Sequence, residues 1–315
     1  MHRFILQPYK GIATRFHCPG CKNKHKTFVR YLDTHTNEIL HESVGRCNRE
    51  SSCGYHFTPK QYFDENNSGQ FNYSKYRTVK FLPTPKAKVS YINHDIFLRS
   101  LSHYQDNNFV AYLISHLGIT ITNAVLGKYS IGTSRHWNGA TVFWQIDIAG
   151  NIRTGKIMLY NPHTGRRVKE PFNYITWAHT LLHQPNFSLN QCLFGEHLLK
   201  ANSKPVAIVE SEKTAIIASV YLPQFIWLAV GSITNLSVKR CKVLTGKQIV
   251  LFPDLNGFEK WSIKALELKQ IAKVSVSGYL EENATDLEKS KGLDIADYLI
   301  REPGWAGINS VQIGT

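Results

Sequence analysis

The chain has 315 residues, with 37 Lys and Arg against 23 Asp and Glu, a formal net charge of +14 and a hydrophobic content of 43%. This length suggests two or three domains, and the apolar content is ample for packed cores. No apolar run approaches the ~20 residues of a membrane span, and the N-terminus lacks the apolar core of a signal peptide, so we expect a cytoplasmic protein. The positive charge favours a polyanionic partner, first of all nucleic acid, over a charge that serves solubility alone.

Four cysteines near the N-terminus have a metal-binding spacing. Cys18 and Cys21 form a tight Cys-x₂-Cys knuckle, and Cys47 and Cys53 follow further along the chain. In a reducing compartment this spacing indicates a structural Zn²⁺ held by four thiolates rather than two disulfides. The second knuckle is wider than the usual Cys-x₂-Cys, so a histidine could replace one thiolate. The candidates for that exchange are His17, His25 and His56.

Residues 1–63 resemble a zinc ribbon. The segments 26–33 and 38–40 are predicted as the strands of a hairpin, and a unit of this size buries too little surface to fold comfortably without its metal. Basic and aromatic residues alternate on it, which suits single-stranded nucleic acid. Lys26 and Arg30 are therefore candidate nucleic-acid contacts. Phe28 and Tyr31 could equally form the thin core of the ribbon.

Residues 64–90 are predicted to be a linker, because 64–70 are polar and rich in turn formers and 83–88 are broken by prolines. Residues 91–202 have their own organisation. Helices are expected at 97–101 and 108–117, with Gly118 as a stop, and a hairpin at 140–147 and 153–160. Basic residues in and around the hairpin are candidate contacts to nucleic acid: Arg153, Lys156, Arg166 and Arg167.

From residue 203 onward, strands and helices alternate. Short apolar runs without polar alternation occupy 205–209 and 248–252, which is typical of strands buried on both faces of a parallel sheet, and two further strands are predicted at 225–231 and 273–279. The runs at 205–209 and 248–252 are followed by acids, Glu210 and Asp254, and by helices expected at 211–219 and 257–266. Two further acids, Asp294 and Asp297, open the last helix. Because ligands bind at the carboxyl edge of such sheets, these acids are expected to meet there.

These residues resemble the Toprim fold, which is shared by bacterial-type primases, topoisomerases and some nucleases. The resemblance spans residues 203–302 and rests on three ordered signals: Glu210 after the first strand, Asp254-x-Asn256-Gly257, and Gly292-x-Asp294-x-x-Asp297-Tyr298. The chain departs from the family at Ser211, where Gly is usual, and at Asn256, where the family has a second Asp.

The resemblance implies a divalent-ion site. Three carboxylates about 5 Å apart repel one another by ~3 kcal/mol per pair, so such a cluster requires a cation or a shared proton. Mg²⁺ or Mn²⁺ is the expected ion, and its candidate ligands are Glu210, Asp254, Asn256, Asp294 and Asp297. Glu210, Asp254 and Lys213 are the candidate catalytic residues. Glu210 and Asp254 could alternatively do no more than cap the helices that follow them.

The segment 91–202, with its hairpin and a Phe194-Gly195 segment before the first parallel strand, resembles the N-terminal half of the bacterial primase core. The resemblance implies an α/β protein with a zinc ribbon (1–63), a linker (64–90), a basic primase-core-like subdomain (91–202), a Toprim domain (203–302) and a tail (303–315).

The function implied is Mg²⁺-dependent primer synthesis on single-stranded DNA for a phage, plasmid or conjugative element. Its partners would be single-stranded DNA, nucleotides and a replicative helicase or another replication protein. One alternative is a non-catalytic nucleic-acid-binding accessory protein, because Asn256 removes a charge from the site, and another is a Toprim nuclease. Topoisomerase activity is disfavoured, because this length leaves no room for a separate domain with a nucleophilic tyrosine.

Overall fold

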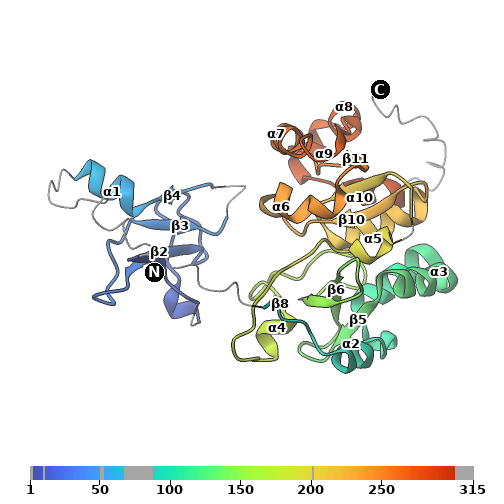
Figure 1. Cartoon of the computed structure of the whole chain (residues 1–315), viewed down its shortest axis with the longest axis horizontal. Coiled ribbons are helices and arrows are strands. Elements are labelled where there is room, and N and C mark those ends of the chain that lie inside the picture. Colours follow the sequence, from blue (N-terminus) through green and yellow to red (C-terminus); the bar gives the residue numbers. More distant parts are fainter. Residues whose placement is uncertain (1–2, 10, 50–52, 67–87, 201, 302–315) are drawn as a thin grey trace. The chain divides into compact units, whose positions relative to one another are not determined.

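The computed structural model describes residues 3–9, 11–49, 53–66, 88–200 and 202–301 (Figure 1). The chain divides into two compact units, residues 1–86 and 87–315. The predicted fold class, an N-terminal ribbon followed by α/β structure with a parallel sheet, is confirmed. Most of the predicted linker, 64–90, and all of the predicted tail, 303–315, lie outside the described residues.

The first unit is an antiparallel sheet in the order β1-β2-β3-β4, followed by a helix. Its elements are β1 (Phe4–Leu6), the 3₁₀ turn η1 (Ile12–Thr14), β2 (Phe28–Asp33), β3 (Gly45–Cys47), β4 (His56–Phe57) and α1 (Pro59–Glu65). Thr58 and Gln61 form a capping box at the start of α1, where Pro59 occupies the first turn. These local signals fix where the helix begins.

The predicted hairpin of this unit is present, but its second arm is short. The segment 38–40 makes a single bridge to β2, between Leu32 and Ile39. Asn37 adopts a left-handed conformation with φ 60° at the turn, and two backbone hydrogen bonds of 2.9 Å flank the bridge, from Asp33 N–H to the Glu38 carbonyl and from Leu40 N–H to the Tyr31 carbonyl. The continuous partners of β2 are β1 and β3.

The second unit begins with an antiparallel sheet in the order β5-β6-β7-β8. Its elements are α2 (His94–Ser100), η3 (Tyr104–Asp106), α3 (Asn108–Tyr129), β5 (Ile131–Ser134), β6 (Ala140–Ile146), β7 (Ile152–Met158), β8 (Ile175–Trp177) and α4 (Ala178–Leu181). Asn107 caps α3, because its side-chain oxygen accepts hydrogen bonds from the backbone N–H groups of Phe109 and Val110. The predicted strands of the 140–160 hairpin correspond to β6 and β7.

Gly118 ends the first of two helical stretches within α3, as predicted. Its backbone has φ 75° and ψ 163°, a conformation that glycine adopts readily, and the helix then resumes to Tyr129. By length and composition α3 is the one helix among the described residues that could cross a membrane. Its buried side chains, among them Leu113, Leu126 and Tyr129, pack in the core of this unit.

The rest of the unit alternates strands and helices around a four-stranded parallel sheet in the order β10-β9-β11-β12. Its elements are η4 (Glu196–Leu199), β9 (Val206–Val209), α5 (Glu212–Tyr221), β10 (Ile226–Ala229), η5 (Ile233–Asn235), α6 (Val238–Cys241), η6 (Lys242–Leu244), β11 (Gln248–Leu251), α7 (Phe258–Leu268), β12 (Lys273–Val276), α8 (Tyr279–Asn283), α9 (Asp286–Lys291) and α10 (Ile295–Arg301).

Helices cover both faces of the parallel sheet (Figure 1). Ala207 and Val209 of β9 pack in one core with side chains of α5 and α10. Val206 and Ile208, which point the other way, pack in a second core with α6 and α7. All four residues of β9 are buried. This explains why the strand is apolar without alternation.

The two sheets of this unit share one core. The Tyr129 hydroxyl at the end of α3 donates a hydrogen bond of 3.1 Å to the backbone carbonyl of Trp227 in β10. The Tyr129 ring stacks on Phe194 at a centroid distance of 5.3 Å, and Phe194 forms a backbone bridge to Ala229. The predicted boundary between segments 91–202 and 203–302 stays a prediction, because both lie in one compact unit.

Candidate active site and metal centre

Two acids follow the central strands at the carboxyl edge of the parallel sheet. Glu210 comes directly after β9, and its backbone carbonyl accepts a hydrogen bond of 2.8 Å from Gly231 N–H. Asp254 lies three residues after β11, the neighbour of β9. Ser211 and Gly257 occupy the N-cap positions of α5 and α7. Neither acid therefore caps the helix that follows it. The alternative prediction, that Glu210 and Asp254 do no more than cap these helices, is wrong.

The Asp254 side chain is half-buried at this edge, and its Oδ1 atom is fully buried. Burial raises its pKa well above the usual value, and the negative charges of Asp294 and Glu210 raise it further. Its Oδ1 is buried without a hydrogen-bond partner among the described residues. An unpartnered carboxylate oxygen in such surroundings is stable when it binds a cation or a proton.

Asp294 and Asp297 cap α10 reciprocally. Oδ1 of Asp294 accepts from the Asp297 N–H, and Oδ2 of Asp297 accepts from the Asp294 N–H, both at 3.1 Å. The Thr214 hydroxyl donates a hydrogen bond of 2.6 Å to Asp294. Burial raises the pKa of the Asp294 carboxyl, although the positive charge of Lys213 opposes this effect. These two acids thus have a structural role in addition to their predicted one.

Lys213 carries the positive charge that lies among these acids. Its Nζ is 3.5 Å from Oδ1 of Asp297. Burial alone would lower the pKa of Lys213, but the charges of Asp294 and Asp297 outweigh burial and raise it. The ammonium of Lys213 therefore already neutralises part of the acidic edge.

Glu210 lies toward the antiparallel sheet of the same unit. Burial raises the pKa of its carboxyl, and the positive charges of Lys156 and Arg167 act in the opposite direction. A carboxyl with a raised pKa is a better proton acceptor near neutral pH than an ordinary one. Four basic residues of this region were predicted to contact nucleic acid: Arg153, Lys156, Arg166 and Arg167. Of these, Lys156 and Arg167 lower the pKa of Glu210 through their charge, and Arg167 is the exposed one of the two.

Glu212 is a buried acid of this edge that was not predicted. It is 2% exposed and accepts two hydrogen bonds, of 3.2 and 3.1 Å, from Nζ of Lys156 in β7. Lys156 was predicted to contact nucleic acid, but its ammonium is largely buried in this ion pair. The only signal in the sequence was a second acid two positions after Glu210, at the first residue of α5.

Asn256 lies at the turn after β11 in a left-handed conformation, φ 66°, which Asn tolerates better than most residues. Its side-chain amide donates a hydrogen bond of 2.7 Å to the backbone carbonyl of Lys289 at the end of α9. The amide therefore joins two loops, and its role as an ion ligand stays a prediction.

The acids fit a divalent ion only in part. Their hard oxygen atoms and the unpartnered Oδ1 of Asp254 suit Mg²⁺ or Mn²⁺. However, among the described residues only the four cysteines, and no set of three carboxylates, are close enough together to share one ion. Asp254 with Glu210 or Asp294 beside it could hold one ion.

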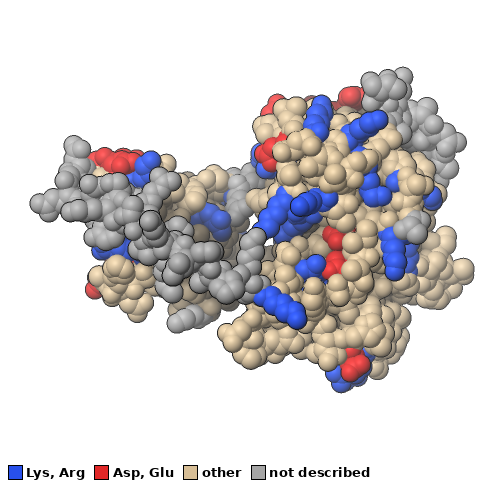
Figure 2. All heavy atoms as spheres, in the orientation of Figure 1, with Lys and Arg blue, Asp and Glu red and all other residues tan. Residues whose placement is uncertain are grey.

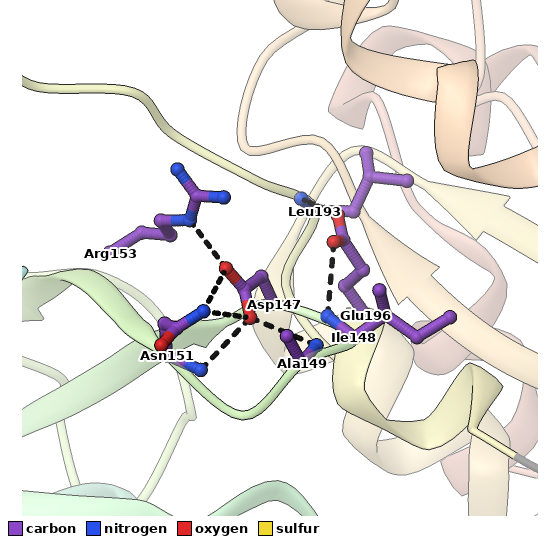
Figure 3. A network of polar contacts seen from close by, with 7 residues as sticks. All are labelled: Asp147, Ile148, Ala149, Asn151, Arg153, Leu193 and Glu196. Atoms are coloured by element: carbon purple, nitrogen blue, oxygen red, sulfur yellow. Dashed lines mark hydrogen bonds and ion pairs between the residues drawn. The ribbon is translucent and has the colours of Figure 1, made fainter. Parts of the chain in front are cut away.

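Arg153 lies away from the acidic edge. Its Nε donates a hydrogen bond of 2.7 Å to Oδ2 of Asp147, whose carboxylate also accepts from Ala149 and Asn151 (Figure 3). Burial opposes ionisation of Asp147, but the hydrogen bonds from Asn151 and Arg153 outweigh it and lower its pKa. Arg166 is exposed in the loop after β7. Unlike Arg167, neither Arg153 nor Arg166 is among the groups whose charge shifts the pKa of Glu210.

In the first unit, the four predicted cysteines come together. The Sγ atoms of Cys18, Cys21, Cys47 and Cys53 all lie within 4.8 Å of one another, and those of Cys18 and Cys53 are 3.7 Å apart. Tetrahedral coordination with Zn–S bonds of ~2.3 Å places sulfur atoms ~3.8 Å apart, so this set fits a structural Zn²⁺. His56, a candidate substitute ligand, instead hydrogen-bonds the Tyr31 hydroxyl at 3.0 Å.

The predicted nucleic-acid contacts of this unit differ in their surroundings. Lys26 is exposed. Arg30 lies with its guanidinium 3.8 Å from the centroid of the Phe16 ring, and its Nε donates to the Glu42 carbonyl. Phe28 is fully buried beside Cys18 and Cys47. The alternative prediction, that Phe28 forms the core of the ribbon, is the correct one.

Fold and site together define an α/β protein with an N-terminal four-cysteine ribbon and an acidic edge on a parallel sheet. Residues 2–68 match a family described as a zinc beta-ribbon finger, and residues 107–255 match a domain of unknown function, DUF6371. No curated protein matches the sequence.

Similar solved structures include three primases. The primase fragment of the bacteriophage T7 primase-helicase protein has 15% identity, covers 88% of this chain and 98% of that chain, and gives a TM-score of 0.38. The zinc binding and RNA polymerase domains of the Aquifex aeolicus primase have 11% identity, cover 95% and 80%, and give 0.37. The DnaG catalytic core has 9% identity, covers 66% and 81%, and gives 0.41.

Proposed function

We propose that this chain is a Toprim primase-like nucleotidyltransferase that makes short primers on single-stranded DNA with Mg²⁺ or Mn²⁺. The observation that carries the proposal is the unpartnered, buried Oδ1 of Asp254 at the carboxyl edge of the sheet, where the charges of Asp294, Glu210 and Asp297 raise the pKa of this carboxyl. The motif resemblance of these same acids and the four-cysteine ribbon in the same chain support it. The resemblance to primases of mobile elements extends the proposal to replication of a phage, plasmid or conjugative element.

In primer synthesis, a 3′-hydroxyl oxygen attacks the α-phosphorus of a nucleoside triphosphate. The new O–P bond forms as the bond to the β-phosphate oxygen breaks, and pyrophosphate leaves. Glu210 would accept the hydroxyl proton, for which its raised pKa suits it. Arg167 would hold a phosphate group beside Glu210. A divalent ion bound by Asp254 and its neighbours would supply neutralisation of the charge on the transferring phosphoryl group.

A second candidate is a nucleic-acid-binding protein without turnover. Two contacts favour it: the Lys213 ammonium is paired with Asp297, and the Asn256 amide is bound to the Lys289 carbonyl. Both contacts let the acidic edge persist without an ion. In this case the edge would be a structural remnant, and DNA binding would depend on the basic residues alone.

The deciding experiment is incorporation of labelled nucleotides on single-stranded DNA with Mg²⁺ or Mn²⁺. Wild type should extend primers, Asp254→Ala should abolish incorporation, and Asp286→Ala, an exposed acid of α9, should leave it intact. DNA binding should be unchanged in all three proteins. Cleavage of the DNA in place of extension would instead identify a nuclease. Absence of either activity in wild type, on every template tried, would favour the binding protein.

Asn256→Asp separates the two candidates further. In an enzyme the added carboxylate should tighten Mg²⁺ binding and preserve or raise incorporation, because ligand charge drives affinity for a hard cation. In a binding protein the added charge should weaken DNA binding in the absence of divalent ions. Neither activity would appear in either protein in that case.

A further inference from the structure

A polar pocket of about 420 Å³ lies in the second unit, apart from the acidic edge. Its lining includes Arg153, Gln191, Glu196, Ser237, Lys239 and Arg240. The acids of the sheet edge do not contribute to this lining: Glu210, Asp254, Asp294 and Asp297. Figure 2 shows Lys and Arg side chains gathered around α6, the helix that carries Lys239 and Arg240.

Two arginines at this pocket have unused hydrogen-bond donors. Arg153 is held through Nε by Asp147, and its terminal nitrogens point away from that carboxylate (Figure 3). Arg240 donates from Nη2 to Oε1 of Gln191 at 3.0 Å. Nη1 of both arginines is buried without a hydrogen-bond partner among the described residues. Buried donors of this kind are rare in folded proteins, because each loses its hydration without replacement.

No carboxylate of the described residues forms an ion pair with Arg240. Burial lowers the pKa of the Arg240 guanidinium. The groups that raise this pKa are the thiols of Cys192 and Cys241, and no carboxylate is among them. Glu196, the acid that lines the pocket, already accepts hydrogen bonds from Ile148 N–H and Leu193 N–H through its two oxygens. Arg153 is paired with Asp147, but neither Arg240 nor Lys239 forms an ion pair with a carboxylate of the described residues.

We propose that this pocket binds the phosphate group of a small phosphorylated ligand of about mononucleotide size. Guanidinium groups pair with phosphate oxygens through parallel charge-assisted hydrogen bonds, and the exposed ammonium of Lys239 adds a third positive charge. The volume lies within the range of about 300–1,000 Å³ typical of small-ligand pockets. Asn190, Gln191 and Ser237 offer amide and hydroxyl groups for the rest of the ligand.

The lining argues against a single strand of nucleic acid as the ligand. Proteins that bind single strands stack bases on aromatic rings. No aromatic side chain of the described residues lines this pocket, although the centroid of the Tyr91 ring lies 5.2 Å from the Arg153 guanidinium carbon. The proposal is independent of the proposed primer synthesis, because it uses different residues.

The test is calorimetric titration of the full chain, in magnesium-free buffer, with pyrophosphate, a nucleoside monophosphate and the matching nucleoside. Wild type should bind both phosphorylated probes and should not bind the nucleoside. Tighter binding of the monophosphate would assign the pocket to a nucleotide, and equal binding would assign it to a phosphate anion. Asp254→Ala should bind as wild type does, which separates this pocket from the acidic edge.

Arg240→Gln should weaken binding at least about tenfold, because it removes charge-assisted hydrogen bonds. Lys239→Gln should weaken it about threefold and, as a surface change, should not affect folding. Lys242→Gln is the matched control, since Lys242 is exposed in η6 and does not line the pocket. Absence of pyrophosphate binding at millimolar concentration, or an equal loss in Lys242→Gln, would overturn the proposal. Equal binding of the nucleoside and the monophosphate would also overturn it.

Discussion

The Lys156 ammonium lies 3.1 and 3.2 Å from the two carboxylate oxygens of Glu212 and joins β7 of the antiparallel sheet to the first turn of α5. Both side chains are buried, so removal of one partner leaves the other charge without compensation. We expect Lys156→Met to lower the free energy of unfolding by about 3–5 kcal/mol. Chemical denaturation measures this quantity.

The double variant Lys156→Met with Glu212→Gln is the control. It removes both charges, so most of the lost stability should return. If the double variant is as unstable as the sum of the two single variants, the ion pair is not what joins these elements.

Asp254 should make stability depend on pH. Burial raises the pKa of its carboxyl above the unfolded value of about 4, so the stability linked to its proton is present below pH ~4. That stability is lost as the pH rises through the folded pKa. Without divalent ions, Asp254→Asn should therefore raise the free energy of unfolding at pH 7 and change it little near pH 4. Thermal unfolding at the two pH values tests this, with Asp286→Asn as the exposed control.

The same experiment reports on the proposed ion. Mg²⁺ should raise the melting temperature of wild type, because a ligand that binds the folded state stabilises it, and should have little effect on Asp254→Asn. An equal effect of Mg²⁺ on both proteins would place the ion elsewhere.

The four-cysteine set should hold one zinc per chain. Cys53→Ser should release most of the metal, because it removes one of four thiolates whose sulfur atoms are already at coordinating distance. His56→Gln should retain it, since His56 bonds Tyr31 instead. Metal analysis of the purified proteins decides, and zinc loss in His56→Gln alone would assign the fourth ligand to the histidine.

Arg167 should contribute to DNA binding more than other exposed arginines do. Its charge acts on Glu210, so a phosphate bound at the acidic edge would lie within its reach. Arg167→Gln should weaken binding to single-stranded DNA and reduce the log-log salt slope by ~0.7, the value for one phosphate contact on a single strand. Fluorescence anisotropy at several salt concentrations measures both. Arg99→Gln, at an exposed position of α2, should change neither, and an equal effect of the two variants would exclude a specific contact.

The amino-acid sequence by itself determined the elements and the kind of chemistry. The runs that became β9 and β11 are apolar without alternation because both faces of each strand are buried. Such a pattern depends only on neighbours in the chain. The spacing of the cysteines predicted the metal set in the same way, and the acids after β9 and β11 marked the edge of the sheet.

The tertiary structure alone decided which charges meet. Lys156 and Glu212 are 56 residues apart, and Thr214 and Asp294 are 80 apart. Strand order and helix packing set these contacts, and no local pattern encodes them. Because of these contacts, Lys156, which was predicted to contact nucleic acid, forms a buried ion pair. Asp294 caps a helix in addition to its predicted role. Strand order and helix packing also placed Arg153 and Arg240 in the lining of one pocket, to which Glu210, Asp254, Asp294 and Asp297 do not contribute. Electrostatic energy depends on distance in space, so the sequence could name the charged residues but not their partners.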